Sequence, residues 1–149
     1  MAGRNKIEMP SSLNFRCSIP VRITDINYGG HVGNDSTLSI IHEARMQYLH
    51  HLGVSELDFG GTGLIMTDVT IEFKMESFYG DTIQAAIAAG DFGRVGFTLY
   101  YQLSKKTEDG QEKIVANAQT GMVCYNYEAK KISGIPQHML ARMNGEFIP

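Results

Sequence analysis

The stretch Thr24–Asp35 reads TDINYGGHVGND and is followed at once by a helical pattern over Ser36–Leu52. Chargeable side chains, consecutive glycines and a helix start are crowded together here and nowhere else in the sequence. Glycine adopts positive φ at little cost and lets another group come close to the backbone. We therefore expect a functional loop that leads into a helix, with the rest of the chain serving as scaffold.

The segment after this loop carries the pattern of an amphipathic helix. Apolar side chains recur three or four residues apart, at Leu38, Ile41, Ala44, Tyr48 or Leu49, and Leu52. Asn34, Asp35 and Ser36 are all suitable N-cap residues, and Gly53 is a suitable stop. The sequence thus predicts one long helix, which spans roughly 25 Å and can cross a sheet of about five strands.

Alternating apolar and polar residues predict strands before and after this helix. The alternating patterns cover residues 15–23, 69–73, 82–89, 95–103 and 114–127. Pro20 cannot donate a hydrogen bond to a sheet, so we expect the first strand at an edge. Turn signals at Tyr79-Gly80-Asp81 and Glu108-Asp109-Gly110 separate later strands, and these strands are expected to form a meander.

One helix can cover only one face of such an antiparallel sheet. The other face needs a different cover, and a second copy of the chain is the simplest one. We therefore expect an obligate homo-oligomer, a dimer or a dimer of dimers.

The composition narrows the class of protein. A chain of 149 residues with 43% hydrophobic content suffices for one globular domain, whose core we expect within residues 13–143. The net charge is −3 and no basic arm is present, which disfavours nucleic-acid binding. The N-terminus lacks the apolar core of a signal peptide, and no stretch reaches the roughly 18 to 20 apolar residues of a membrane span. We expect a soluble, cytoplasmic protein without membrane contact.

The two cysteines, Cys17 and Cys124, lie in strand-like runs and have no Cys or His neighbour at metal-ligand spacing. They are interpreted as buried thiols in a reducing compartment. His31 and His42 are too far apart to share one helix face, so no metal site is expected.

The order and spacing of the motifs resemble the hotdog-fold acyl-CoA thioesterases of the 4-hydroxybenzoyl-CoA thioesterase-like superfamily. The loop Asp25–Asn34 is similar to their D-x-D-x-x-G-H-V-N-N segment, His42-Glu43-Ala44-Arg45 to their E-E-A-R, and Tyr79-Gly80-Asp81 to their Y-G-D turn. The resemblance covers about Phe15 to Pro136. It implies an α+β hotdog fold, in which a five- to six-stranded antiparallel sheet wraps a long central helix, with thioester sites at the interface between subunits.

The activity implied by the resemblance is hydrolysis of an acyl-CoA or acyl-carrier thioester by carboxylate-assisted attack of water. No cofactor is implied beyond the coenzyme A of the substrate. Many members have an aspartate where this chain has Asn27, and Gly33 replaces an asparagine of their pattern. Because an amide cannot act as a carboxylate does, two alternatives stay open. One is a non-hydrolytic acyl-thioester binding or regulatory protein, and the other is a hotdog dehydratase acting on a 3-hydroxyacyl thioester.

Thioester hydrolysis needs a base or nucleophile and donors for the developing oxyanion. Glu43, on the polar stripe of the helix, is the first candidate for the carboxylate, although a solvated face is its ordinary interpretation. Asp35 is the second candidate and is also a suitable N-cap. His31 is a candidate base or donor because histidine titrates near neutral pH. Asn27 is a candidate for positioning a water molecule.

Substrate contacts are expected from the rest of the loop, where glycines and the helix start offer backbone N–H donors. These residues are Asp25, Tyr28, Gly29, Gly30, Gly33 and Asn34. The alternative is that the glycines only form a turn, and that Asp25 only orders the loop. Cations for the phosphates of coenzyme A are available, with solvated charge as their default interpretation, at Arg94, Lys105, Lys106, Lys130 and Lys131.

Overall fold

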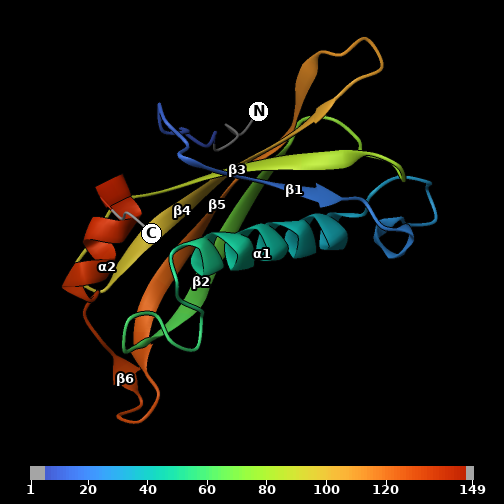
Figure 1. Ribbon diagram of the computed structural model, residues 1–149. Helices are drawn as coiled ribbons and strands as arrows, with labels where there is room; N and C mark the ends of the chain where they lie inside the picture. The colour runs from blue at the N-terminus through green and yellow to red at the C-terminus, as the bar shows by residue number, and fades with distance from the viewer. Residues whose placement is uncertain (1–5, 147–149) are drawn as a thin grey trace.

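The computed structural model describes residues 6–146 and shows an antiparallel sheet with one long helix along it (Figure 1). The strands are β1 (Phe15–Pro20), β2 (Gly63–Phe73), β3 (Thr82–Gly90), β4 (Gly96–Lys106), β5 (Glu112–Asn126) and β6 (Lys131–Ile132). The helices are α1 (Asn34–His51) and α2 (Gln137–Ala141), with a 3-10 turn at Ile23–Asp25 and a further helical turn at Arg142–Glu146. The predicted α+β class and antiparallel sheet are confirmed.

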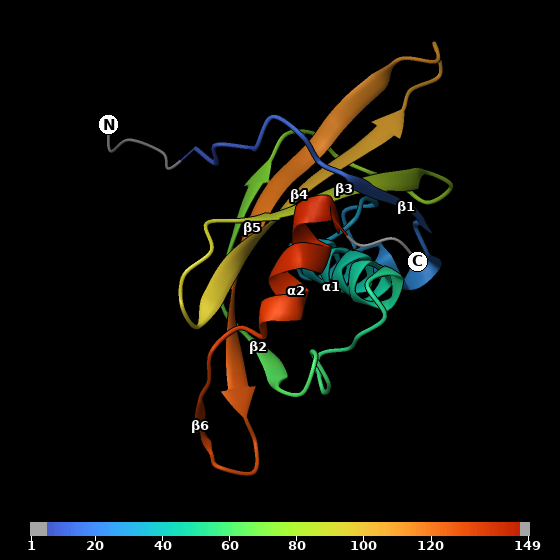
Figure 2. The ribbon, with the colours of Figure 1, turned by 60° about the vertical axis from the view of Figure 1, so that its left-hand side comes forward.

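The core lies between α1 and the face of the sheet that α1 covers (Figure 2). From α1 the core receives apolar side chains that are at most 4% exposed, namely Ile40, Ile41, Ala44, Tyr48 and Leu49. From β5 it receives five buried and mostly small side chains, namely Ala116, Ala118, Thr120, Met122 and Cys124. The opposite side of α1 is exposed at Ser39, Glu43 and His50. The predicted wrapping of a central helix is therefore seen on only one side of it.

The strand order corrects the predicted meander. The order is β1-β3-β4-β5-β2, so β3, β4 and β5 form a meander but β2 pairs with β5 at the far edge of the sheet. The chain therefore crosses the sheet between β2 and β3. β2 also begins at Gly63 rather than Val69, because a bulge between Met66 and Asp68 interrupts its alternation. β1 lies at the other edge, as Pro20 predicted.

The predicted start of the helix is wrong by a short distance. Gly33 is the N-cap of α1, in place of Asn34, Asp35 or Ser36, and no side chain caps the first turn. The predicted strand at residues 15–23 also ends early, at Pro20. A 3-10 turn follows because the Asp25 carboxylate accepts the backbone N–H of Arg22 at 2.8 Å.

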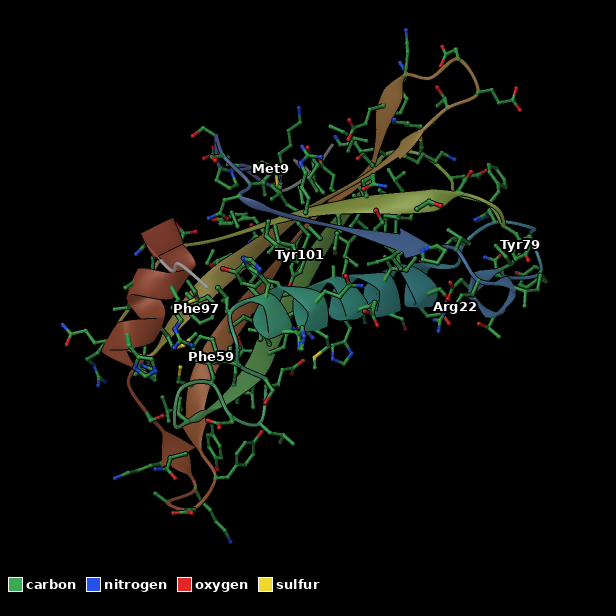
Figure 3. The ribbon with its side chains drawn as sticks, in the orientation of Figure 1. Met9, Arg22, Phe59, Tyr79, Phe97 and Tyr101 are labelled. Carbon is green, nitrogen blue, oxygen red and sulfur yellow. The ribbon has the colours of Figure 1, made fainter. Side chains whose placement is uncertain are left out.

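The predicted core face of α1 is wrong at Leu38, which is 37% exposed, and it omitted Arg45, which is 4% exposed. Arg45 tolerates burial because it has polar partners: Nη1 lies 3.3 Å from Tyr101 Oη and Nε lies 3.4 Å from Glu56 Oε1. Tyr101 lies between the helix and the sheet (Figure 3). Within residues 6–146, no helix has both the length and the apolar character that crossing a membrane requires.

Candidate active site

A cavity of about 270 Å³ opens where the loop and the first half of α1 meet the end of β2. Its inner wall is apolar and buried, formed by Ile40, Ile83, Leu103 and Val115. Its remaining lining comes from the loop, from α1, and from the end of β2 with the segment that follows it, at His31, Val32, Asn34, Thr37, Phe73, Lys74, Met75, Glu76 and Ser77. The cavity thus combines an apolar interior with a polar mouth.

Backbone hydrogen bonds hold the loop over this mouth. The Asn27 N–H donates to the His31 carbonyl at 2.9 Å, and the Gly30 N–H donates to the Asn27 carbonyl at 3.0 Å, which closes a tight hairpin. The Val32 N–H then donates to the Ser77 carbonyl at 2.8 Å. The loop before α1 is therefore fixed to the segment after β2. In Figure 3, Arg22 and Tyr79 mark the end of the molecule where these two segments lie.

His31 and Glu76 face each other across this junction. His31 Nδ1 lies 3.1 Å from the carbonyl oxygen of Val32, and because a carbonyl can only accept, that bond assigns the ring proton to Nδ1. His31 Nε2 then carries the lone pair and lies 3.9 Å from Glu76 Oε1. His31 and Glu76 thus place a candidate base and a carboxylate together at the mouth of the cavity.

Of the loop residues expected at the site, His31 and Asn34 line the cavity. Asn27 Oδ1 accepts the Gly29 N–H at 2.9 Å, which is a turn-forming bond. Gly30 has a φ of 85°, so it uses glycine's conformational freedom.

Other loop positions present their groups to solvent. Tyr28 is fully exposed. Asp35 is exposed in the first turn of α1, and a Cβ on Gly33 would lie 2.6 Å from its Oδ1, so Gly33 leaves room for this carboxylate.

Glu43 lies away from the first cavity. It borders a separate hollow of about 450 Å³ between β1 and α1, together with Arg22 and Asp25. Its Oε2 accepts a hydrogen bond from Gln47 at 2.8 Å. Asp25 is 3% exposed, and its carboxylate is held by Arg22, so its contacts are those of a residue that orders the loop.

The family model described as the thioesterase-like superfamily matches residues 21–143, which is most of the chain and includes every residue that lines the first cavity. The chain belongs to the thioesterase-like superfamily. The resemblance proposed from the motifs is thus confirmed. Among similar proteins, the 1,4-dihydroxy-2-naphthoyl-CoA hydrolase of Synechococcus elongatus is 27% identical over 123 residues, covering 80% of this chain and 87% of that protein.

Solved structures of thioesterases share the fold. A thioesterase-superfamily protein from Jannaschia superposes with a TM-score of 0.80 at 18% identity, covering 92% of this chain and 85% of its own. The 4-hydroxybenzoyl-CoA thioesterase of a Pseudomonas strain superposes with a TM-score of 0.76 at 16% identity, covering 86% of this chain and 97% of its own. The 1,4-dihydroxy-2-naphthoyl-CoA thioesterase of Synechocystis superposes with a TM-score of 0.78 at 23% identity, covering 91% of this chain and 98% of its own. The predicted hotdog thioesterase fold is therefore confirmed.

Two residues that line this cavity, Glu76 and Ser77, were not predicted from the sequence. They lie between two strand patterns, in a stretch that has no periodicity of its own. The one local feature that could have indicated them is their position shortly before the Tyr79-Gly80-Asp81 turn. The hydrogen bond from the Val32 N–H to the Ser77 carbonyl joins segments that are far apart in the sequence, so no local pattern predicts it.

Lys105 corrects the prediction of a solvated cation. It is 7% exposed, and its Nζ lies 2.8 Å from both Asp81 Oδ2 and the Glu76 carbonyl oxygen. The same ammonium lies 5.1 Å from the centre of the Phe78 ring. Lys105 is therefore a positioning residue that fixes the segment carrying Glu76 and Ser77.

The cysteines offer no nucleophile at this site. Both are free thiols outside the cavity lining. Burial, with a smaller contribution from the Glu43 charge, raises the pKa of Cys17 to about 11, and burial raises the pKa of Cys124 to about 11. Both are therefore protonated at neutral pH. Within the described part of the chain, no three His, Cys, Asp or Glu side chains are grouped as metal ligands would be.

Proposed function

We propose that this protein hydrolyses an acyl-CoA thioester whose acyl group enters the cavity between α1 and the sheet. The observation that carries the proposal is the pair of His31 and Glu76, with 3.9 Å between Nε2 and Oε1, at the mouth of an apolar cavity. The family, and relatives named as CoA thioester hydrolases, support this class of reaction.

In the proposed mechanism, His31 Nε2 takes a proton from a water molecule as the water attacks the thioester carbonyl. The Glu76 carboxylate stabilises the imidazolium that forms. The carbonyl oxygen becomes negative, and the first-turn N–H groups of α1, which no side chain caps, are suited to stabilise it. The carbon–sulfur bond then breaks, the His31 imidazolium returns its proton to the departing sulfur, and coenzyme A thiol and the free acid are released.

The choice of Glu76 as the carboxylate differs from the candidates expected from the sequence. Glu43 borders a different hollow and is bonded to Gln47, and Asp35 does not line the cavity. Among the described residues, Glu76 is the carboxylate that lies within 4 Å of the His31 ring, at 3.9 Å from Nε2. These observations favour Glu76, and separate substitutions of Glu76, Glu43 and Asp35 distinguish the three candidates.

The proposed substrate has a compact acyl group. A volume of about 270 Å³ lies near the lower end of the range for ligand sites, and the coenzyme A moiety remains outside it. Relatives are named for 1,4-dihydroxy-2-naphthoyl-CoA and 4-hydroxybenzoyl-CoA, which carry aromatic acyl groups. We therefore propose an aromatic acyl-CoA rather than a long-chain one.

We also propose that two or more copies associate. Large apolar side chains are exposed beside the cavity mouth, at Phe73, Met75, Phe78 and Tyr79. β2 ends the sheet at one edge, and no helix within residues 6–146 covers the sheet face opposite α1 (Figure 2). A solution mass from light scattering at one chain would overturn this proposal.

The function is tested by thiol release from a panel of acyl-CoAs, comprising aromatic, short-chain and long-chain members, read with a thiol-reactive dye. We expect release from aromatic members above the uncatalysed background. Thermal stabilisation by an acyl-CoA without release would favour the non-hydrolytic binding protein, for which Asn27 in place of a carboxylate is the supporting observation. Thiol release seen only with an acyl group carried on acyl carrier protein would show that the substrate is not an acyl-CoA.

A further inference from the structure

Two lysines lie opposite each other on the hairpin formed by β4 and β5. Lys105 of β4 and Lys113 of β5 are partners in the register of the two strands. Directly opposed residues of an antiparallel pair point to the same face of the sheet, with their Cβ atoms about 5 Å apart, and like charges in this position are destabilising. The hairpin therefore carries an unfavourable pair of charges, which needs an explanation.

The protein compensates the charge of Lys105 but not that of Lys113. Lys105 is 7% exposed, and its ammonium lies 2.8 Å from the carboxylate of Asp81. Lys113 is exposed, and no carboxylate among residues 6–146 lies within 4 Å of its ammonium. Lys113 is therefore the member of the pair whose charge is left for an anion from outside the protein.

Lys113 points to the side of the sheet on which the cavity opens. Leu103 forms part of the inner wall of the cavity, and Lys105 follows it by two residues on β4, so both side chains point to the same face. The Lys105 ammonium also donates to the carbonyl of Glu76 at 2.8 Å, at the cavity mouth. The hairpin extends beyond the end of β2 (Figure 1). Lys113, opposite Lys105, therefore lies just outside the mouth.

The cations that the sequence suggested for the phosphates of coenzyme A lie elsewhere in the chain. Lys106 is opposite Glu112 in the register, so it points to the other face of the hairpin. Three further cations lie beyond the ends of β4 and β5 that are farthest from the hairpin turn, namely Arg94, Lys130 and Lys131. Within one chain, Lys113 is therefore better placed for a phosphate near the mouth than any of these residues.

We propose that Lys113 is a substrate-binding residue, whose ammonium binds a phosphate group of coenzyme A. This inference rests on the proposed thioesterase function and deepens it. The pantetheine arm separates the phosphates from the thioester, so a thioester held at His31 and Glu76 leaves the phosphates outside the cavity. An ammonium forms strong hydrogen bonds with phosphate oxygens. The bound phosphate also supplies the negative charge that offsets the repulsion between Lys113 and Lys105.

The test uses the acyl-CoA of the panel that is hydrolysed fastest and the N-acetylcysteamine thioester of the same acid, which lacks every phosphate. Lys113→Met should raise KM for the acyl-CoA by about fivefold and leave kcat unchanged, because an ionic contact at the surface is lost while the reacting groups stay in place. KM for the N-acetylcysteamine thioester should not change. The acyl 4′-phosphopantetheine then shows whether the phosphate involved is the one that acyl carrier protein shares with coenzyme A.

Lys106→Met is the matched control, since it removes an exposed lysine from the opposite face of the same hairpin. It should leave both KM values unchanged. An equal rise of KM for the acyl-CoA in the two variants, or a rise in Lys113→Met for both substrates, would overturn the inference. Lys113→Met should not lower the melting temperature of the unliganded protein, because the substitution removes a repulsion. A lower melting temperature together with a lower kcat would assign Lys113 a structural role instead.

Failure of the proposed function is recognised separately. If no acyl-CoA is hydrolysed, the thermal shifts given by coenzyme A and by pantetheine, which lacks the phosphates, still test Lys113. A larger shift with coenzyme A that disappears in Lys113→Met and persists in Lys106→Met supports the inference. Equal shifts with the two compounds in the unmodified protein, or a difference that survives Lys113→Met, would overturn it.

Discussion

Val32 donates its backbone N–H to the carbonyl oxygen of Ser77 over 2.8 Å. This bond joins the loop before α1 to the segment after β2. The residues that precede the two partners, His31 and Glu76, come within 3.9 Å of each other, and the partners themselves both line the cavity. One backbone contact between distant parts of the sequence therefore holds the proposed catalytic pair at the mouth of the cavity.

The proposed carboxylate predicts a clear order among substitutions. Glu76→Gln keeps the size of the side chain but removes its charge, so the imidazolium of His31 loses its stabilising partner. We expect kcat to fall by about tenfold or more, which corresponds to roughly 1.4 kcal/mol of barrier. Glu43→Gln and Asp35→Asn should reduce kcat less, as measured by thiol release. A larger loss at Glu43 or Asp35 would contradict the assignment to Glu76 and support the candidates expected from the sequence.

His31 predicts a larger effect, because it is the proposed base. His31→Gln retains a polar side chain but cannot accept a proton from water. We expect kcat to fall by about 100-fold or more, the usual scale for removal of a general base. His50→Gln is the matched control, since His50 is exposed on α1 and lies outside the cavity lining. Equal activity of the two variants would show that His31 is not the base.

The sequence predicted those features that depend on local periodicity. The long helix and the strands from β3 to β5 follow from patterns of period 3.6 and 2, and Pro20 placed β1 at an edge. The position of β2 beside β5 depends on long-range pairing, which no local pattern contains.

Burial of charged residues was the main source of error. Lys105 was expected to be solvated, and Arg45 was not predicted to lie in the core, yet each is nearly buried. Their burial is possible because the fold brings distant partners to them, Tyr101 and Glu56 in one case and Asp81 in the other. Glu76 and Ser77 were missed for the same reason, because their contacts with His31 and Val32 join distant parts of the sequence.

The buried hydrogen bonds that join Arg45, Tyr101 and Thr120 predict a loss of stability when the Tyr101 hydroxyl is removed. Tyr101 Oη lies 3.3 Å from Arg45 Nη1 and 2.7 Å from Thr120 Oγ1. Tyr101→Phe leaves both groups without this partner, so we expect the free energy of unfolding to fall by about 1–3 kcal/mol in urea denaturation. Tyr48→Phe is the matched control, because the Tyr48 hydroxyl is buried but has no partner among residues 6–146. It should cause little or no loss, and a similar loss in both variants would contradict a specific role for the network.

Asp81 predicts how stability depends on acid pH. Partial burial by itself would raise the pKa of Asp81, but hydrogen bonds from Lys105 and the Phe78 N–H, with the charge of Lys105, outweigh it and lower the pKa below its ordinary value of 3.8. The unfolded chain therefore binds this proton more readily than the folded protein does. The resulting stabilisation is complete above the ordinary pKa and is lost as the pH falls through the lower pKa of the folded state.

We therefore expect the difference in unfolding free energy between the unmodified protein and Asp81→Asn to be largest near neutral pH. It should shrink as the pH falls below about 3.8. Urea denaturation at a series of pH values measures this difference directly, and the other carboxylates largely cancel because both proteins share them. In a Lys105→Met background the same comparison should lose most of its pH dependence, because the hydrogen bond and charge from Lys105 are gone. A difference that stays constant with pH in both backgrounds would show that the ion pair of Asp81 and Lys105 does not lower the carboxyl pKa.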